Sequence, residues 1–170
     1  EAGVREVAVE VSAQALSRHR VDGLVFDVAG FTNLSHDHLD DYADMEEYFA
    51  AKASLFDPRL TVLGVVNADD EHGRRLSAAA PIEIVEFTRA QASDEVVGPG
   101  ALHFTWHGGN EPVRIDVPVG GAFNVMNALA AATTAAALGV GTEAIVVGLA
   151  TLDPVPGRFE RVTAVGGGVS

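Results

Sequence analysis

Segments with strand character alternate with segments of helical character through the first half of the chain, and this order limits the possible folds more than any other feature. The strand-like segments, rich in β-branched and aromatic residues, span residues 5–12, 22–32, 60–66 and 82–87. The helical segments span residues 13–18, 44–58 and 71–80. Strands joined through helices pair side by side in the same direction. The order therefore predicts an α/β fold with a doubly wound, mostly parallel sheet flanked by helices.

A different pattern begins near residue 96. Apolar and polar residues alternate over residues 102–106 and 113–117, and a Gly-Gly-Asn sequence lies between these two runs. This pattern predicts a small antiparallel hairpin. Residues 122–138 have helical composition and are followed by Gly139, and a shorter helix is expected at 142–149 with Thr142 as its N-cap. Residues 158–165 resemble one more strand.

Size and charge restrict the class of protein. A chain of 170 residues that is 48% hydrophobic can bury the core of one globular domain. The absence of cysteine excludes disulfides and thiol chemistry and is compatible with the cytoplasm. The longest apolar run is too short to span a membrane. A net charge of −13 with only 11 Lys and Arg argues against nucleic acid as a partner, and a nucleotide would need a divalent metal to bridge the negative charges.

Lys52 lies within the apolar stripe of a predicted helix. The helix has the capping-box residues Asp44 and Glu47 at its start and ends at Pro58. The stripe consists of Met45, Tyr48, Phe49, Leu55 and Phe56. Two interpretations remain open: the aliphatic stem lies on apolar surface while the ammonium reaches water, or burial favours a neutral amine that adds carbon dioxide and becomes an anionic metal ligand.

The loop after the second strand-like segment concentrates polar side chains. Its sequence, FTNLSHDHLDDY, contains Asn33, Ser35, His36, Asp37, His38, Asp40 and Asp41. Ligands bind at the carboxyl ends of the strands in doubly wound sheets, and Glu10 would reach the same edge from the end of another strand. Imidazole and oxygen ligands suit Mg²⁺ or Mn²⁺. The alternative is a polar loop that only caps the next helix.

In this order and spacing, these residues resemble the middle domain of the Mur ligases. The matching strings are EVS at 10–12, AL at 15–16, HRV at 19–21, NLSHDHLDDY at 33–42, AAKASLFDP at 50–58, GAFNVMNALAA at 121–131 and VPGRFE at 155–160. The pair NLSxDHLD and AAKxxLF is the specific part of the signal. Within the family, the chain is most similar to the UDP-N-acetylmuramoyl-tripeptide synthetase type.

The resemblance implies an ATP-dependent, Mg²⁺-dependent ligase of peptidoglycan synthesis. Such an enzyme activates UDP-N-acetylmuramoyl-dipeptide as an acyl phosphate and joins it to a diamino acid, either lysine or diaminopimelate. It further implies that Lys52 is carbamylated and that Lys52 and His38 are catalytic. The implied site residues are Glu10, His38 and Lys52 for Mg²⁺, Ser12, Arg20 and Asn33 for the UDP substrate, and Asn124, Asn127 and Arg158 for ATP.

The sequence also departs from the family pattern. Ala13 and Gln14 stand where the tripeptide-synthetase type usually has Ser and His, and Arg18 stands where Gln is common. No GxxGKT or GKS string occurs, although Mur ligases hold the ATP phosphates with such a loop. We therefore expect residues 1–170 to be part of a central domain, without the phosphate-binding loop and the N-terminal and C-terminal domains, and to be inactive alone.

Other functions remain compatible with these residues. The alternatives are an amide ligase of the folylpolyglutamate or cyanophycin synthetase type, a non-catalytic Mur-like binding subunit, and a metal-dependent hydrolase built on Asp37 and His38. The residues around Ser12 and Arg20 favour a muramoyl substrate. The joint presence of Glu10, His38 and Lys52 favours a working catalytic site.

Overall fold

The computed structural model describes residues 3, 5–35 and 41–153. The chain divides into two compact units between Glu86 and Phe87. No helix within these described ranges has the length and apolar character needed to cross a membrane.

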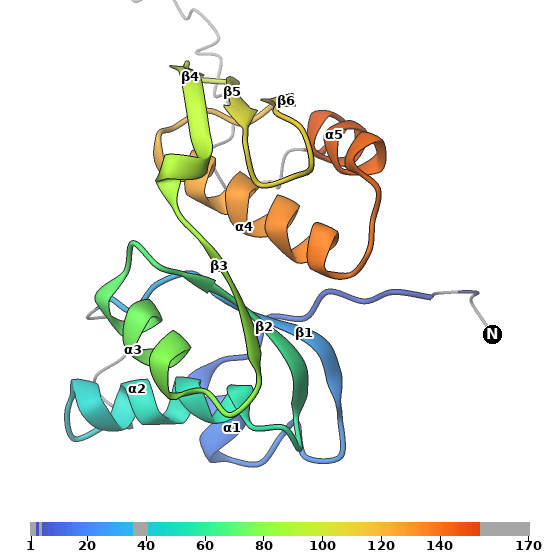
Figure 1. Cartoon of the computed structure of the whole chain (residues 1–170). Helices are drawn as coiled ribbons and strands as arrows, with labels where there is room; N and C mark the ends of the chain where they lie inside the picture. The colour runs from blue at the N-terminus through green and yellow to red at the C-terminus, as the bar shows by residue number, and fades with distance from the viewer. Residues whose placement is uncertain (1–2, 4, 36–40, 154–170) are drawn as a thin grey trace, which may run out of the picture. The chain divides into compact units, whose positions relative to one another are not determined.

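A three-stranded parallel sheet of order β1-β2-β3 organises the first unit (Figure 1). Its strands are β1 (Phe26–Phe31), β2 (Thr61–Asn67) and β3 (Glu83–Phe87). Its helices are α1 (Ala13–Ser17), α2 (Met45–Ala53), the 3₁₀ turn η2 (Ser54–Phe56) and α3 (Glu71–Ala79). In the parallel pairing of β1 with β2, Phe26 lies opposite Thr61 and Phe31 opposite Val66. The sheet and its helices confirm the predicted α/β class.

The start of α2 is fixed by side-chain caps, as the sequence predicted. Asp44 Oδ1 accepts a hydrogen bond from the Glu47 amide at 2.9 Å, which satisfies a donor that has no partner inside the helix. The Glu47 carboxylate accepts from the Ala43 amide at 2.7 Å, one residue earlier than in an ideal capping box. Ser12 and Asp70 cap α1 and α3 in the same way.

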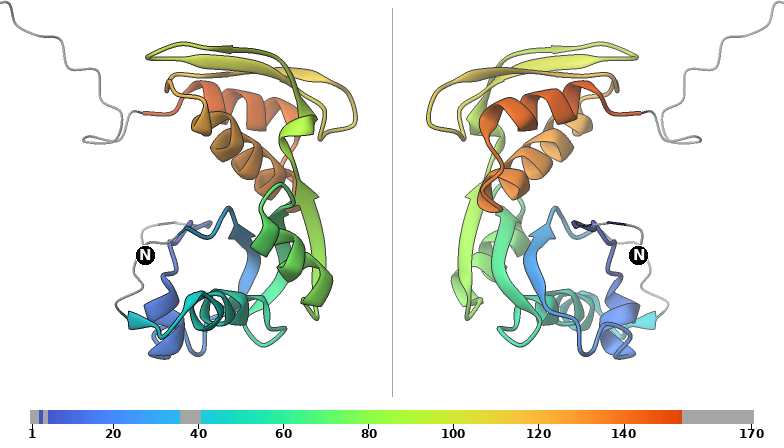
Figure 2. Two further views of the ribbon diagram at one scale, coloured as in Figure 1. Left: turned by 90° about the vertical axis from the view of Figure 1, so that its left-hand side faces the viewer. Right: turned by 90° about the vertical axis from the view of Figure 1, so that its right-hand side faces the viewer.

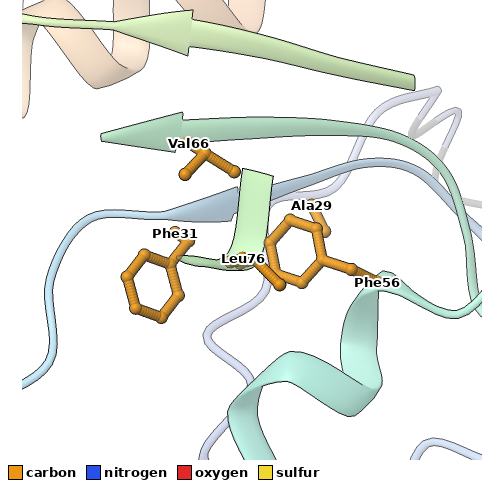
Figure 3. Close-up of a cluster of buried hydrophobic side chains, with 5 residues drawn as sticks. All are labelled: Ala29, Phe31, Phe56, Val66 and Leu76. Carbon is orange, nitrogen blue, oxygen red and sulfur yellow. The ribbon is translucent and has the colours of Figure 1, made fainter. Parts of the chain in front are cut away.

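The core of the first unit joins the sheet to the elements that follow β1 and β2. Its buried members are Ala29, Phe31, Phe56, Val66 and Leu76 (Figure 3). Phe49 and Ala53 of α2 pack against this cluster. Gly64 allows the close packing, because a Cβ atom there would lie 2.4 Å from Ile84 Cδ1 and 2.9 Å from Phe56 Cδ1. The cluster thus fixes the helix that carries Lys52 against the sheet.

In the second unit, two helices cover one face of an antiparallel sheet of order β4-β5-β6 (Figure 2). The strands are β4 (Ala92–Val97), β5 (Leu102–Trp106) and β6 (Val113–Val117), and the 3₁₀ turn η3 (Arg89–Gln91) precedes them. The helices are α4 (Phe123–Ala137) and α5 (Thr142–Ala150). Alternate residues of β5 and β6 are buried, and α4 packs on β5 while α5 packs on β6. The C-cap of α4 is Leu138, and Gly139 follows it with a φ of +80°, the left-handed conformation in which helices commonly end.

Two sequence-based predictions are wrong in detail, the strand at residues 5–12 and the N-cap at Thr142. Residues 5–12 form no strand: they pair with no other strand in the described ranges, and Val7 and Val9 are 75% and 58% exposed. Alternation cannot create a strand without a neighbour to accept its backbone hydrogen bonds. The predicted hairpin is confirmed, because β5 and β6 pair antiparallel, and β4 adds a third strand that the sequence analysis did not predict. The N-cap of α5 is Gly141, and Thr142 is already helical. The predicted strand at 158–165 lies outside the described residues.

Candidate functional site

A pocket of about 510 Å³ lies in the first unit, between the segment that leads into α1, strand β1 and helix α2. Glu10, Ser12 and Lys52 all line it. A smaller pocket of about 70 Å³ shares Lys52 and adds Asn33. The fold therefore brings four of the predicted site residues, separated by up to about forty positions in the sequence, to two neighbouring cavities.

Lys52 is the only lysine in the sequence, and it lies in the wall shared by both pockets. Its side chain is half-buried, and its Nζ lies 5.3 Å from the centroid of the Tyr48 ring. A cation over the face of an aromatic ring is held by the negative charge of that face. The half-buried side chain and the cavity that it lines are compatible with both interpretations of Lys52.

Two tyrosines that the sequence analysis did not assign also line the larger pocket. The rings of Tyr42 and Tyr48 have centroids 5.2 Å apart and are tilted by 31°. The Tyr42 hydroxyl lies 3.2 Å from Ser17 Oγ in α1. The spacing of Tyr48 four residues before Lys52 was a visible signal, because such residues share a helix face. Tyr42 ends the family-matching string at 33–42, but the sequence analysis gave it no role.

Glu10 and Ser12 supply oxygen atoms to the pocket. The Ser12 oxygen accepts a hydrogen bond from the Ala15 amide at 3.1 Å, and its hydroxyl proton can still be donated to a ligand. The exposed Glu10 carboxylate is an acceptor and a potential cation ligand. Mg²⁺ prefers such oxygens and retains several waters, so one or two carboxylate groups and the substrate phosphates complete its coordination. The donor chemistry therefore fits Mg²⁺.

Predicted metal ligand His38 and predicted ATP ligand Arg158 lie outside the described residues. Among residues 3, 5–35 and 41–153, no three His, Asp or Glu side chains gather closely enough to form a metal site by themselves. A carbamate on Lys52 would add a second anionic ligand beside Glu10 in the larger pocket. Both the metal role of His38 and the ATP role of Arg158 stay predictions.

Arg20 is the predicted substrate residue that the structure does not bring to the pocket. Its backbone amide donates to the Ala15 carbonyl at 2.8 Å at the end of α1, and the residue is exposed. The described residues that line the two cavities do not include it. Its contact with substrate stays a prediction.

Asn67 fixes the carboxyl ends of β1 and β2, a role that the sequence analysis missed. Its Nδ2 donates to the Thr32 carbonyl at 2.8 Å, and its Oδ1 accepts from the Asp69 amide at 3.0 Å. The side chain is nearly buried, so both bonds are protected from water. Because Thr32 lines the pocket, Asn67 holds a backbone segment that forms part of the pocket wall.

A charged pair, Glu46 and Arg75, joins α2 to α3. Arg75 donates to the two carboxylate oxygens of Glu46 at 2.8 and 2.7 Å, and its guanidinium lies 4.6 Å from the centroid of the Phe49 ring. The hydrogen bonds from Arg75 lower the pKa of the Glu46 carboxyl below its ordinary value. The pair therefore helps to hold α2, and with it Lys52, in place.

In the second unit, Asn124 and Asn127 form one amide pair at the start of α4. Asn127 Nδ2 donates to Asn124 Oδ1 at 2.8 Å, which confirms that the two amides share a helix face. Asn124 Nδ2 in turn donates to the Gly120 carbonyl at 2.6 Å. Asn124 lies inside the helix, whose N-cap is Ala122, so it is not the capping residue that the alternative interpretation required. The pair has the polar groups needed to contact a nucleotide base.

Comparison with known proteins gives consistent matches. Residues 1–135 match the family model described as the Mur ligase middle domain. The UDP-N-acetylmuramoyl-L-alanyl-D-glutamate--2,6-diaminopimelate ligase of Streptomyces avermitilis is 48% identical over 170 residues, which are 95% of this chain and 34% of that protein. The UDP-N-acetylmuramyl-tripeptide synthetase of Leifsonia xyli is 44% identical over 176 residues, covering 96% of this chain and 34% of that protein.

The same type of protein is found among solved structures. A structure of a UDP-N-acetylmuramoyl-L-alanyl-D-glutamate--2,6-diaminopimelate ligase matches with a TM-score of 0.74 and 27% identity, covering 87% of this chain and 32% of that one. The chain thus spans about a third of the length of the curated relatives it matches.

Proposed function

The chain belongs to the Mur ligase family through its middle domain, and we propose that it is the central part of a ligase that adds diaminopimelate to UDP-N-acetylmuramoyl-dipeptide. The observation that carries this proposal is that Glu10, Ser12 and Lys52 line one pocket. We propose diaminopimelate and not lysine as the added amino acid, because the relative with 48% identity is named as a diaminopimelate ligase. The setting would be peptidoglycan synthesis in the cytoplasm, where ATP is available.

The charge of the chain supports a role for metal. A protein with a net charge of −13 repels a nucleotide and a UDP-linked substrate unless a cation lies between them. Mg²⁺, when bound, would neutralise the negative charge that develops during phosphoryl transfer. Among the described residues, Glu10 and a carbamylated Lys52 would hold it. His38, which lies outside the described residues, is the third proposed ligand.

Lys52 changes its charge in this proposal. The ammonium first loses one proton, the neutral amine attacks carbon dioxide to form a C–N bond, and a second proton is released, so that a cation becomes an anionic carbamate. The ring of Tyr48 attracts the ammonium form. Pairing with a divalent cation would stabilise the carbamate form. Lys52 thereby becomes a ligand suited to a site that binds phosphates.

The remaining residues bind and orient the reactants. A substrate carboxylate attacks the γ-phosphorus of ATP and ADP leaves. The amine of diaminopimelate then attacks the resulting acyl phosphate, and phosphate leaves as the amide forms. Ser12 can donate its hydroxyl proton to the UDP substrate while its oxygen remains bonded to Ala15. Asn33 and Arg20 are further substrate contacts, and Asn124, Asn127 and Arg158 are ATP contacts.

A ligation assay on the full-length protein tests the proposal. With UDP-N-acetylmuramoyl-dipeptide, ATP and Mg²⁺, we expect one ADP and one amide product per diaminopimelate consumed, and much slower turnover with lysine. Turnover with a folate substrate, or ADP release that needs no amino acid, would point to another ligase or to a hydrolase. A full-length protein that binds these ligands without turnover would be the non-catalytic alternative.

A further inference from the structure

We propose that one face of α1 positions the amine of Lys52 by holding a pair of tyrosines beside it. The residues on this face, which we call the α1 clamp, are Gln14, Ser17 and Arg18. The inference rests on the proposed function, because it concerns the amine that the proposed metal site uses. The clamp residues act through other side chains, so they are positioning residues and not catalytic ones.

Side chains of α1 and its C-cap contact Asp41 and Tyr42. Gln14 Nε2 donates a hydrogen bond to Asp41 Oδ2, and Arg18 Nη2 lies 3.7 Å from Asp41 Oδ1. Ser17 Oγ lies 3.2 Å from the Tyr42 hydroxyl. Gln14 and Ser17 lie three positions apart on one side of α1, and Arg18 is the C-cap residue of the same helix. One face of α1 therefore binds two consecutive residues.

A second contact leads from Tyr42 to Tyr48. The two ring centroids are 5.2 Å apart, within the range in which aromatic rings attract each other. Tyr48 is only 6% exposed and belongs to the core, whereas Tyr42 is half-buried. The ring of Tyr42 consequently depends on its contacts with Tyr48 and Ser17 for its orientation.

A third contact leads from Tyr48 to Lys52, one helical turn later. The amine lies 5.3 Å from the Tyr48 ring centroid. Gln14, Tyr42, Tyr48 and Lys52 all line the larger pocket, so the chain of contacts runs along the pocket wall. Release of Asp41 and Tyr42 from α1 would let water reach the Tyr48 ring and would free the amine to leave the wall.

A charge reversal at Arg18 tests the clamp. In Arg18→Glu the new carboxylate repels Asp41, and the double variant Arg18→Glu with Asp41→Arg restores an ion pair with reversed charges. The matched control is Arg59→Glu, because Arg59 pairs with Asp57 in an exposed ion pair elsewhere in the same unit. All three variants can be compared with the unchanged chain for folding by ¹H–¹⁵N spectra.

The readout is the NMR signal of the Lys52 ε-methylene group in the ¹³C-lysine-labelled chain, which has no other lysine. A methylene held over an aromatic ring is shifted upfield by the ring current. We expect Arg18→Glu to move the signal toward the value of free lysine, the reversed pair to move it back, and Arg59→Glu to leave it unchanged. An unchanged Lys52 signal in a folded Arg18→Glu chain would overturn the proposal.

The intact ligase gives a second readout that a loss of folding would not mimic. Because exposed ion pairs are weak, we expect Arg18→Glu to raise the Mg²⁺ concentration for half-maximal activity by roughly two- to fivefold, with recovery in the reversed pair. A change only in the KM for the UDP substrate would contradict a positioning role. An inactive unchanged ligase would refute the proposed function, whereas the Lys52 signal would still decide whether the clamp positions the amine.

Discussion

The ammonium nitrogen of Lys52 lies 5.3 Å from the ring centroid of Tyr48, the residue one turn earlier on α2. The ring favours the cationic form of this lysine, whereas a divalent cation would favour its carbamate. The same pocket wall holds Glu10, which has the chemistry to share such a cation. Variants of these residues can separate their structural roles from their proposed roles in ligation.

Replacement of Lys52 by arginine separates charge from carbamate chemistry. The guanidinium introduced by Lys52→Arg would keep a cation near Tyr48 but could not form the carbamate, so the protein should fold normally and lose ligase activity. Since loss of even an outer-shell partner of a metal costs about 10- to 100-fold, we expect a loss of about 100-fold or more in kcat. Steady-state ligation by the full-length protein measures this, with thermal unfolding as the control. Nearly unchanged kcat would remove Lys52 from the metal site.

The two asparagines of α4 should behave differently when truncated. Asn124→Ala loses the bonds to Gly120 and Asn127, so it should lower the free energy of unfolding by about 1 kcal/mol and also weaken ATP binding. Asn127→Ala removes the more exposed amide, so it should weaken ATP binding with less loss of stability. Calorimetric titration with ATP and thermal melts on both variants check this. Equal ATP affinity in the unchanged protein and in Asn127→Ala would argue against the nucleotide role.

The Glu46–Arg75 pair should make stability depend on acid pH. Because hydrogen bonds from Arg75 lower the pKa of Glu46, the folded state binds this proton less readily than the unfolded state does. The stabilisation should be fully present above about pH 5 and should disappear as the pH falls through the folded-state pKa. Unfolding curves of the unchanged chain and of Glu46→Gln, recorded across this pH range, should therefore converge at low pH. A constant difference at every pH would contradict the assignment.

Gly73 should not tolerate a side chain. A Cβ atom there would lie 2.0 Å from the Asn67 carbonyl oxygen, which belongs to the backbone and cannot rotate away. We expect Gly73→Ala to destabilise the chain by roughly 1–3 kcal/mol, the usual cost of overpacking. Gly148 is the matched control, because nothing lies within 4 Å of its Cβ position in α5. Gly148→Ala should instead stabilise the helix by about 0.5–1 kcal/mol in denaturant unfolding. Equal effects of the two substitutions would show that space around Gly73 is not limiting.

Much of the fold could be predicted because local patterns coincide with tertiary packing. The apolar runs of β1, β2 and β3 and the capping residue Asp44 appear in the structure within a few residues of their predicted places. Residues 5–12 failed because alternation indicates only a preference, and pairing depends on a neighbouring strand. The pairing of β4 with β5 was missed for a related reason. The register of this pair shifts between Ser93 and Val96, which interrupts the alternation of apolar and polar residues along β4.

The site was partly predictable from the sequence. Lys52 could be singled out because a lysine in an apolar stripe is unusual. Glu10 was expected at the carboxyl edge of the sheet from a strand that does not form, and its metal role, like the substrate role of Ser12, came from the family resemblance. The α1 clamp could not be predicted from the sequence. Gln14 and Arg18 differ from the usual family residues, but only the structure shows that both side chains contact Asp41. Asn67 was missed because its role depends on a tertiary contact. Its side chain bonds to Thr32, which is 35 residues away in the sequence, as well as to the nearby Asp69.

A high-resolution electron-density map of Lys52, from the full-length protein crystallised with bicarbonate and Mg²⁺, tests the central claim most directly. The proposed site predicts a carboxylated Nζ that faces a metal ion shared with Glu10. A bare ammonium over the Tyr48 ring, with no metal beside Glu10, would contradict it.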